Sequence, residues 1–317
     1  MTPNTPVLNP RQCFPEALDF TAPDSILPLF DLSEIADGIT ATVLADAKQI
    51  RLAGTINHTD FTLTIDLAGA AGHTKPWQIV TAAKLFFYCY PQMYARFGRS
   101  DTPRDVILLI EDFDYEIACA WENKVHIHDQ WLEQCPEDFD CLTHEFAHTV
   151  QGDWQDGYMP QQEDDTYMVE RFADFCRYLY AYKSGLFNDR GWELQTPEGE
   201  GNPFDSVRFW VWLDYTYSTP DRDIIREMNE CIHQNSEEYN IAAWMPDGSA
   251  WQTVFAGTGA YGKDLFALWE EYMASGIAYL SSGVEEEGAV SPLLQAVPLR
   301  KAIHQRYSAA RTYLKCE

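Results

Sequence analysis

Hydrophobic and polar residues alternate along three segments near the start of the chain. Turn-like residues at 46–48 and 57–60 separate these segments, which span residues 39–45, 49–56 and 61–67. A period of two with many threonine, valine and isoleucine residues is typical of antiparallel strands. The preceding residues, 1–38, are rich in proline and aspartate, and they predict an extended arm with one short helix around Leu32–Ala36.

The pattern then changes to helical spacing. Apolar residues recur every three or four positions through 76–96, and Pro76 suits the first turn of a helix. Pro91 lies inside this stretch and predicts a kink or a break. An apolar run at 105–111 predicts a buried strand, and the alternation at 124–129 predicts a second, less buried strand.

The rest of the chain is predicted to be mostly helical. A helix at 136–152 has Asp138 or Asp140 as a candidate N-cap and Gly152 as a stop. A long loop is expected at 185–204. Further helices are expected at 166–184, 206–218, 221–233, 263–275 and 298–313.

Charge excludes two classes of partner. The 317 residues include 49 acidic and 22 basic ones, which gives a formal net charge of −27. Such a polyanion is a poor ligand for nucleic acid or for an anionic membrane surface.

The sequence contains no run of about 18 apolar residues, so we expect no membrane span. The N-terminus lacks a signal-peptide pattern, so we expect a cytoplasmic protein if the chain is full length and a secreted one if a signal peptide was removed.

The eight cysteines are scattered through the chain, and none forms a CxxC pair. A disulfide framework is unusual for a chain of this length, so most cysteines are expected to be reduced and buried. Cys135 and Cys141 are close in sequence, so a local disulfide between them remains an alternative.

The segment with the most specific chemistry is His144-Glu145-Phe146-Ala147-His148, an HExxH pattern. On a helix the two histidines are one turn apart on the same face, so both imidazoles can bind one zinc ion. Glu145 lies beside the first histidine and can take a proton from a zinc-bound water. The alternative is a polar helix face with two incidental histidines.

A third ligand must come from elsewhere, because Gln151 and Trp154 exclude the longer HExxHxxGxxH pattern. Glu170 lies 22 residues after His148 and would complete a His₂Glu site. Asp174, one helical turn further, can orient a ligand imidazole from outside the coordination sphere. Alternatively, both carboxylates are surface charges or pair with Arg171 and Arg177.

Several sequence blocks follow one another along the chain, including CPEDFD at 135–140, HEFAHTVQ at 144–151, ERFADF at 170–175 and the helix at 207–214. These blocks, in this order, resemble the plant basic secretory protein family, which has bacterial and fungal relatives and is regarded as a family of zinc-dependent peptidases. The resemblance covers about residues 60–275. The chain departs from the family in being strongly acidic and in carrying Arg171, where the family often has glycine.

Motif and resemblance together imply an α+β, zincin-like metallopeptidase with a small mixed sheet, an HExxH helix and a mostly helical C-terminal half. Residues 1–58 would form an N-terminal arm and strand-rich segment, and 59–317 the catalytic domain. One Zn²⁺ on His144, His148 and Glu170 would activate water, with Glu145 as general base and a peptide or protein as substrate.

Tyr158 and Tyr167 are candidate donors to the developing oxyanion, although simple packing is the alternative. His126 and His128 share one strand face, either as extra metal ligands or as solvated side chains. We further expect the strand at Lys124–Asp129 to be an exposed edge that binds substrate as an added strand. Two other functions stay open: a zinc hydrolase acting on a non-peptide substrate, and an inactive relative used in binding or defence.

Overall fold

The computed structural model describes residues 14–113, 117–136, 138–152, 167–181, 206–219, 221–235, 263 and 265–275. The chain divides into two compact units. The first contains Met1–Asp153, Leu179–Asn188 and Ala309–Glu317, and the second contains Trp154–Tyr178 and Asp189–Ser308. Among the described residues, no helix is long and apolar enough to cross a membrane.

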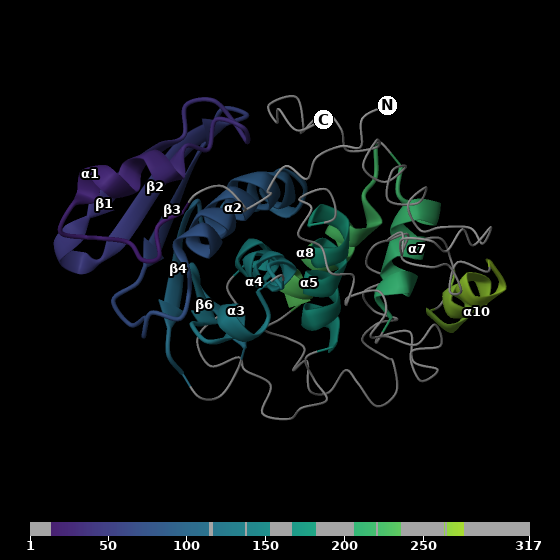
Figure 1. Cartoon of the computed structure of the whole chain (residues 1–317). Helices are drawn as coiled ribbons and strands as arrows, with labels where there is room; N and C mark the ends of the chain where they lie inside the picture. The colour runs from purple at the N-terminus through teal and green to yellow at the C-terminus, as the bar shows by residue number, and fades with distance from the viewer. Residues whose placement is uncertain are drawn as a thin grey trace, which may run out of the picture. The chain divides into compact units, whose positions relative to one another are not determined.

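Within the described residues, the first unit is built on a mixed sheet of six strands (Figure 1). The strands are β1 (Thr40–Leu44), β2 (Gln49–Ile56), β3 (Thr59–Asp66), β4 (Asp105–Glu111), β5 (Ala118–Trp121) and β6 (Lys124–His128), and their order is β1-β2-β3-β4-β6-β5. Neighbours pair antiparallel from β1 to β3, parallel from β3 through β4 to β6, and antiparallel from β6 to β5. The predicted α+β class and five of these strands are confirmed.

The turn between β2 and β3 consists of Asn57 and His58, which both have positive φ angles, 52° and 64°. Two central residues with positive φ are typical of the tight hairpin turn that matches the twist of the flanking strands. The boundary expected after residue 58 falls in this turn. The N-terminal strands therefore share one sheet with β3 and β4.

One face of the sheet is the core of the first unit. Helices α2 (Pro76–Phe97) and α4 (Asp140–Gln151) pack against each other and lie on this face (Figure 1). Every second residue of the central strands points into the core and is buried, as the alternation predicts. These residues are Ile50, Leu52, Phe61, Leu63, Ile65, Val106, Leu108, Ile110, Val125 and Ile127.

Helix α2 runs through Pro91 without interruption, so the expected break is wrong. A proline inside a helix removes one hydrogen bond and costs about 3 kcal/mol. The side chains around it offset this penalty, because Phe86, Phe87 and Tyr90 are fully buried. Burying one such side chain contributes about 1.5–3 kcal/mol. Tertiary packing thus keeps a helix that local propensity would split.

The N-terminal arm contains two short helical turns, α1 (Pro23–Ile26) and η1 (Leu27–Phe30). The short helix expected at Leu32–Ala36 is wrong. These residues form a single turn in which the N–H groups of Ile35 and Ala36 donate to the carbonyl of Leu32. The turn does not continue as a helix, because Gly38 follows with a φ of 78°.

Strand β5 was not predicted, since Ala118–Trp121 has no apolar alternation. It pairs antiparallel with β6, whose other side pairs with β4. Strand β6 is therefore hydrogen-bonded along both sides, and the expectation that Lys124–Asp129 is an exposed edge is wrong. Among the described strands, β5 is the edge on this side of the sheet.

The described part of the second unit is helical. It contains α5 (Tyr167–Tyr180) as far as Tyr178, followed by α7 (Val207–Tyr217), α8 (Ile224–Asn235) and α10 (Leu265–Ser275). Aromatic rings join α7 to α10, with Phe209 and Trp212 at 5.5 and 5.8 Å from Tyr272 between ring centroids. The helix expected at 298–313 and the loop expected at 185–204 lie outside the described residues.

A buried carboxylate holds the segment that leads into α2. Asp129 is fully buried, and its two carboxylate oxygens accept hydrogen bonds from the backbone N–H groups of Gly72, His73 and Thr74 at 2.8, 3.0 and 2.7 Å. Burial raises the pKa of Asp129, but the hydrogen bonds from Thr74, His73 and Gly72 outweigh burial and lower the pKa below its usual value.

We expect Asp129→Asn to lower the free energy of unfolding by about 2–4 kcal/mol, because it removes the buried negative charge to which three backbone N–H groups donate. Since the pKa of Asp129 is lower in the folded state, the carboxylate stabilises the fold above pH ~4 and loses this effect as the pH falls further. Urea unfolding of the wild-type protein and of Asp129→Asn at pH 7 and pH 3 measures the difference in unfolding free energy at each pH. Asp105→Ala, at an exposed carboxylate, is the control and should change stability by less than about 0.5 kcal/mol.

Candidate metal centre

Helix α4 carries the HExxH pattern and begins at Asp140, four residues later than expected. The residue before it, Phe139, offers no side-chain cap, so the predicted capping by Asp138 or Asp140 is wrong. Asp140 is instead the first helical residue and is buried. A carboxylate at this position interacts favourably with the positive end of the helix dipole. Gly152 follows the last turn with a φ of 95°, as the sequence predicts.

The buried side of α4 orients the histidines. Leu142, Phe146 and Val150 are fully buried, and the Phe146 ring meets Phe86 of α2 edge-on at 5.2 Å between centroids. The helix also contacts β5 and β6. His144 and His148 lie on a different side of the helix and are half-buried.

The two imidazoles face each other. Nε2 of His144 and Nε2 of His148 are 3.1 Å apart, and the ring planes are inclined at 81°. Two ligands of one tetrahedral zinc, each at about 2.0–2.1 Å from the metal, are separated by roughly 3.3 Å. The pair therefore has the spacing that one ion requires. Glu145, between them in sequence, is buried.

The last residues of α5, Leu179 and Tyr180, belong to the first unit, and Tyr180 contacts α2 there. The thiol of Cys89 on α2 donates to the carbonyl of Tyr180 at 3.6 Å, and it accepts from the Thr143 hydroxyl at 3.7 Å. Burial raises the pKa of Cys89 to about 12, so this group stays a thiol and keeps its proton. The ring of Tyr180 also meets Phe97 edge-on. One side chain of α2 thus contacts the helix that carries the histidines and the end of the helix that carries Glu170.

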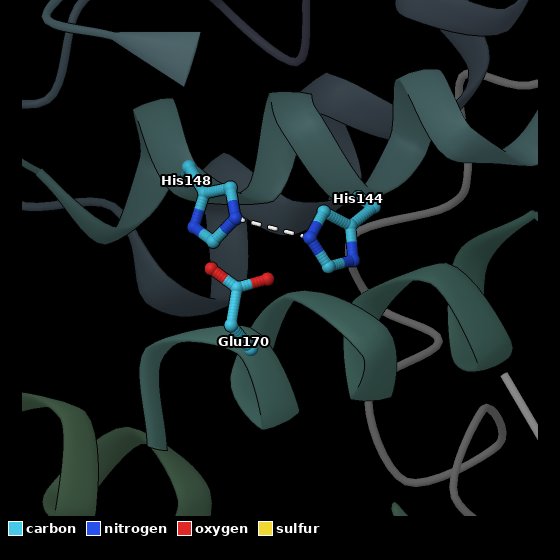
Figure 2. A group of neighbouring side chains, drawn as sticks. All are labelled: His144, His148 and Glu170. Carbon is cyan, nitrogen blue, oxygen red and sulfur yellow. Dashed lines mark hydrogen bonds between the residues drawn. The ribbon is translucent and has the colours of Figure 1, made fainter. Parts of the chain in front are cut away.

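The described residues contain one group of three potential metal ligands, and it consists of His144, His148 and Glu170. One ligand atom from each lies within 4.8 Å of the other two. Figure 2 shows the carboxylate of Glu170, on α5, pointing toward both imidazole rings. A carboxylate with two imidazoles is a donor set that zinc accepts in catalytic sites, so these residues fit the expected metal. All three are half-buried, which leaves room for solvent.

Asp174 lies one turn after Glu170 and accepts a hydrogen bond from Arg171 at 2.7 Å. The pairing with Arg171 is one of the alternatives that the sequence leaves open. The orientation of His144 by Asp174 stays a prediction.

The other candidate residues have different outcomes. Tyr158 lies outside the described residues, and Tyr167 is the first residue of α5, whose side chain is likewise outside them. His126 pairs with Glu111, and His128 lies 3.5 Å from Asp112, so both histidines have carboxylate partners. Cys135 and Cys141 are both thiols, and Cys141 donates to the carbonyl of Asp138 at 2.9 Å. The local bridge that the sequence left open is therefore not formed.

No protein family, curated protein or solved structure gives a significant match to this chain.

Proposed function

We propose that this protein is a zinc-dependent metallopeptidase of zincin-like architecture. It binds one zinc ion through Nε2 of His144, Nε2 of His148 and a carboxylate oxygen of Glu170. The observation that carries the proposal is the grouping of these three ligand atoms around an HExxH helix. Two histidines one turn apart with a glutamate between them are a recurrent arrangement for water activation.

Bound zinc would supply a Lewis acid that lowers the pKa of a water and polarises the scissile carbonyl. Glu145 takes the proton of that water on a carboxylate oxygen and passes it to the leaving amine nitrogen. His144 and His148 bind from one helix face, while Glu170 adds a negative charge from a second helix. Glu145 follows His144 directly in sequence, and its side chain is buried.

The edge strand β5 favours a peptide as the substrate. Helix α4 contacts this strand. The bond from His128 N–H to the Ile117 carbonyl shows that residues 117, 119 and 121 direct their backbone groups toward β6. The N–H and C=O groups of Ala118 and Ala120 therefore point away from β6. An extended peptide can pair with such an edge through its main chain.

The first test is hydrolysis of an unfolded protein such as casein by the purified full chain. We expect about one zinc per chain by elemental analysis, loss of hydrolysis with a chelator, and recovery on adding Zn²⁺. Hydrolysis that persists in metal-free protein would contradict the proposal. Zinc binding with cleavage of esters but not of peptides would instead favour the non-peptide hydrolase, and zinc binding without any hydrolysis the inactive relative.

A variant of the edge strand tests the substrate class in the same assay. Ala120→Pro removes an N–H that points away from β6 and leaves the ladder with β6 intact, a position where strands tolerate proline. We expect KM for extended peptides to rise while the zinc content is unchanged. Ala120→Val keeps the N–H and serves as the matched control.

A further inference from the structure

A second cluster of reactive groups lies on the other face of the sheet, away from α2 and α4. His126 on β6 and Glu111 on β4 point to this face, because their neighbours Ile127 and Ile110 are buried in the core. Nδ1 of His126 lies 2.5 Å from Oε1 of Glu111. This contact directs the ring N–H at the carboxylate and leaves Nε2 as the basic nitrogen.

The position of Glu111 is set by the backbone that crosses the end of β4. A Cβ atom at Gly69 would come within 2.8 Å of the Cβ of Glu111, so only glycine allows this approach. The N–H of Asp112 donates to the Gly69 carbonyl at 3.3 Å, which holds the two segments together. The packing of Gly69 against β4 therefore fixes the position of Glu111, whose carboxylate orients His126.

Cys119 lies directly opposite His126 in the antiparallel ladder of β5 and β6. Residues opposite each other in such a ladder share a face, and their Cβ atoms are about 5 Å apart. Cys119 is half-buried and carries a thiol. A thiol, an imidazole and a carboxylate from three adjacent strands thus follow one another in the order of a nucleophile, its base and the group that orients the base.

We propose that Cys119 is an activated thiol and a site of oxidation by hydrogen peroxide. Nε2 of His126 takes the proton of the thiol, and Glu111 stabilises the imidazolium that forms. The thiolate sulfur attacks one oxygen of the peroxide, the O–O bond breaks, and the departing hydroxide takes the proton from His126 to give water. Sulfur is oxidised to a sulfenic acid while the peroxide is reduced by two electrons.

Charged groups on β6 and β4 affect the ionisation of the Cys119 thiol. The imidazolium of His126 and the ammonium of Lys124, which lies on the same face, favour the thiolate. Glu111 favours the imidazolium, whereas Asp112 is engaged with His128 at 3.5 Å. The positive charges adjoin Cys119 on β6, and the carboxylate of Glu111 is one strand further away on β4.

Other cysteines provide the comparison. Cys89, Cys141 and Cys176 are buried, and Cys89 is held as a thiol by burial. Cys135 is half-buried like Cys119, but it directly follows the short helix α3 (Trp131–Gln134), and no strand among the described residues pairs with it. Cys135 is therefore a matched internal control, because it has a similar exposure to Cys119 but no histidine opposite it in a β-ladder.

The test is the rate of alkylation by iodoacetamide at each cysteine of the full chain, followed by peptide mass spectrometry from pH 5 to pH 9. At pH 7 we expect Cys119 to react about tenfold faster than Cys135, with a rate midpoint below the ordinary thiol pKa of about 8.5. His126→Gln should reduce the rate to that of Cys135. Hydrogen peroxide followed by dimedone should label Cys119 and leave Cys135 unlabelled.

Equal rates at Cys119 and Cys135, or a Cys119 rate that His126→Gln leaves unchanged, would overturn the proposal. If His126→Gln does not fold, as judged by circular dichroism, the proposal is tested instead by the pH dependence of the Cys119 alkylation rate in the wild-type protein and in Glu111→Gln. In Glu111→Gln we expect the Cys119 rate at pH 7 to fall by roughly threefold to tenfold. Removing zinc should change none of these rates, so this result is independent of the proposed peptidase activity.

Discussion

Replacing Glu145 with glutamine is expected to leave zinc binding intact and to slow peptide hydrolysis by about a thousandfold. General acid–base catalysis by a positioned side chain contributes about 10²–10⁴-fold, and glutamine cannot take up the proton. The substitution is nearly isosteric, so α4 and the two imidazoles should stay in place. Zinc content by elemental analysis and kcat on an unfolded protein substrate measure the two effects separately.

Two results would contradict the role of Glu145. Loss of zinc from Glu145→Gln would make this residue a ligand, and full activity in the variant would require another base. Glu16→Gln removes a carboxylate from an exposed position and is the matched control for the change in net charge. It should alter neither zinc content nor kcat.

Glu170→Ala is expected to lower zinc affinity by more than 100-fold, because it removes one of three protein ligands. Asp174→Ala should lower zinc affinity by about 10–100-fold, as loss of a group that orients a ligand typically does. Zinc titration against a competing chelator measures both values. The reverse order of the two effects would exchange the roles of the carboxylates.

The ion pair between Arg171 and Asp174 requires its own control. The two side chains are mostly buried and joined at 2.7 Å, so Asp174→Ala also leaves Arg171 without this partner. Arg171→Met breaks the same pair but keeps the Asp174 carboxylate. If Asp174 acts through His144, Arg171→Met should change zinc affinity by less than about threefold, whereas equal losses in both variants would assign the effect to the ion pair.

Local patterns predicted the elements whose periodicity is strong. The alternation at 39–45, 49–56 and 61–67 corresponds to β1, β2 and β3, because the buried face of a strand needs every second side chain to be apolar. The placement of His144 and His148 on one helix face follows from a spacing of four residues and needs no tertiary contact. Gly152 ends the same helix for a local reason, its positive φ.

Other features needed the tertiary structure. Strand β5 has no pattern of its own and exists as the hairpin partner of β6, so the true edge of the sheet could not be found from sequence. Helix α2 keeps Pro91 because its aromatic residues are buried, which local propensity does not include. The capping expected of Asp138 fails because its carboxylate accepts a hydrogen bond from Nε1 of Trp131 instead.

The sequence by itself determined the chemistry that α4 carries, since two histidines and a glutamate on one helix are placed by helical geometry alone. Only the tertiary structure decided what these residues meet. The carboxylate of Glu170 and the pairing of Cys119 with His126 and Glu111 depend on how separate elements pack and on strand register. Spacings along the chain do not determine such contacts, because loop closure costs little more for one length than for another, and burial selects the arrangement.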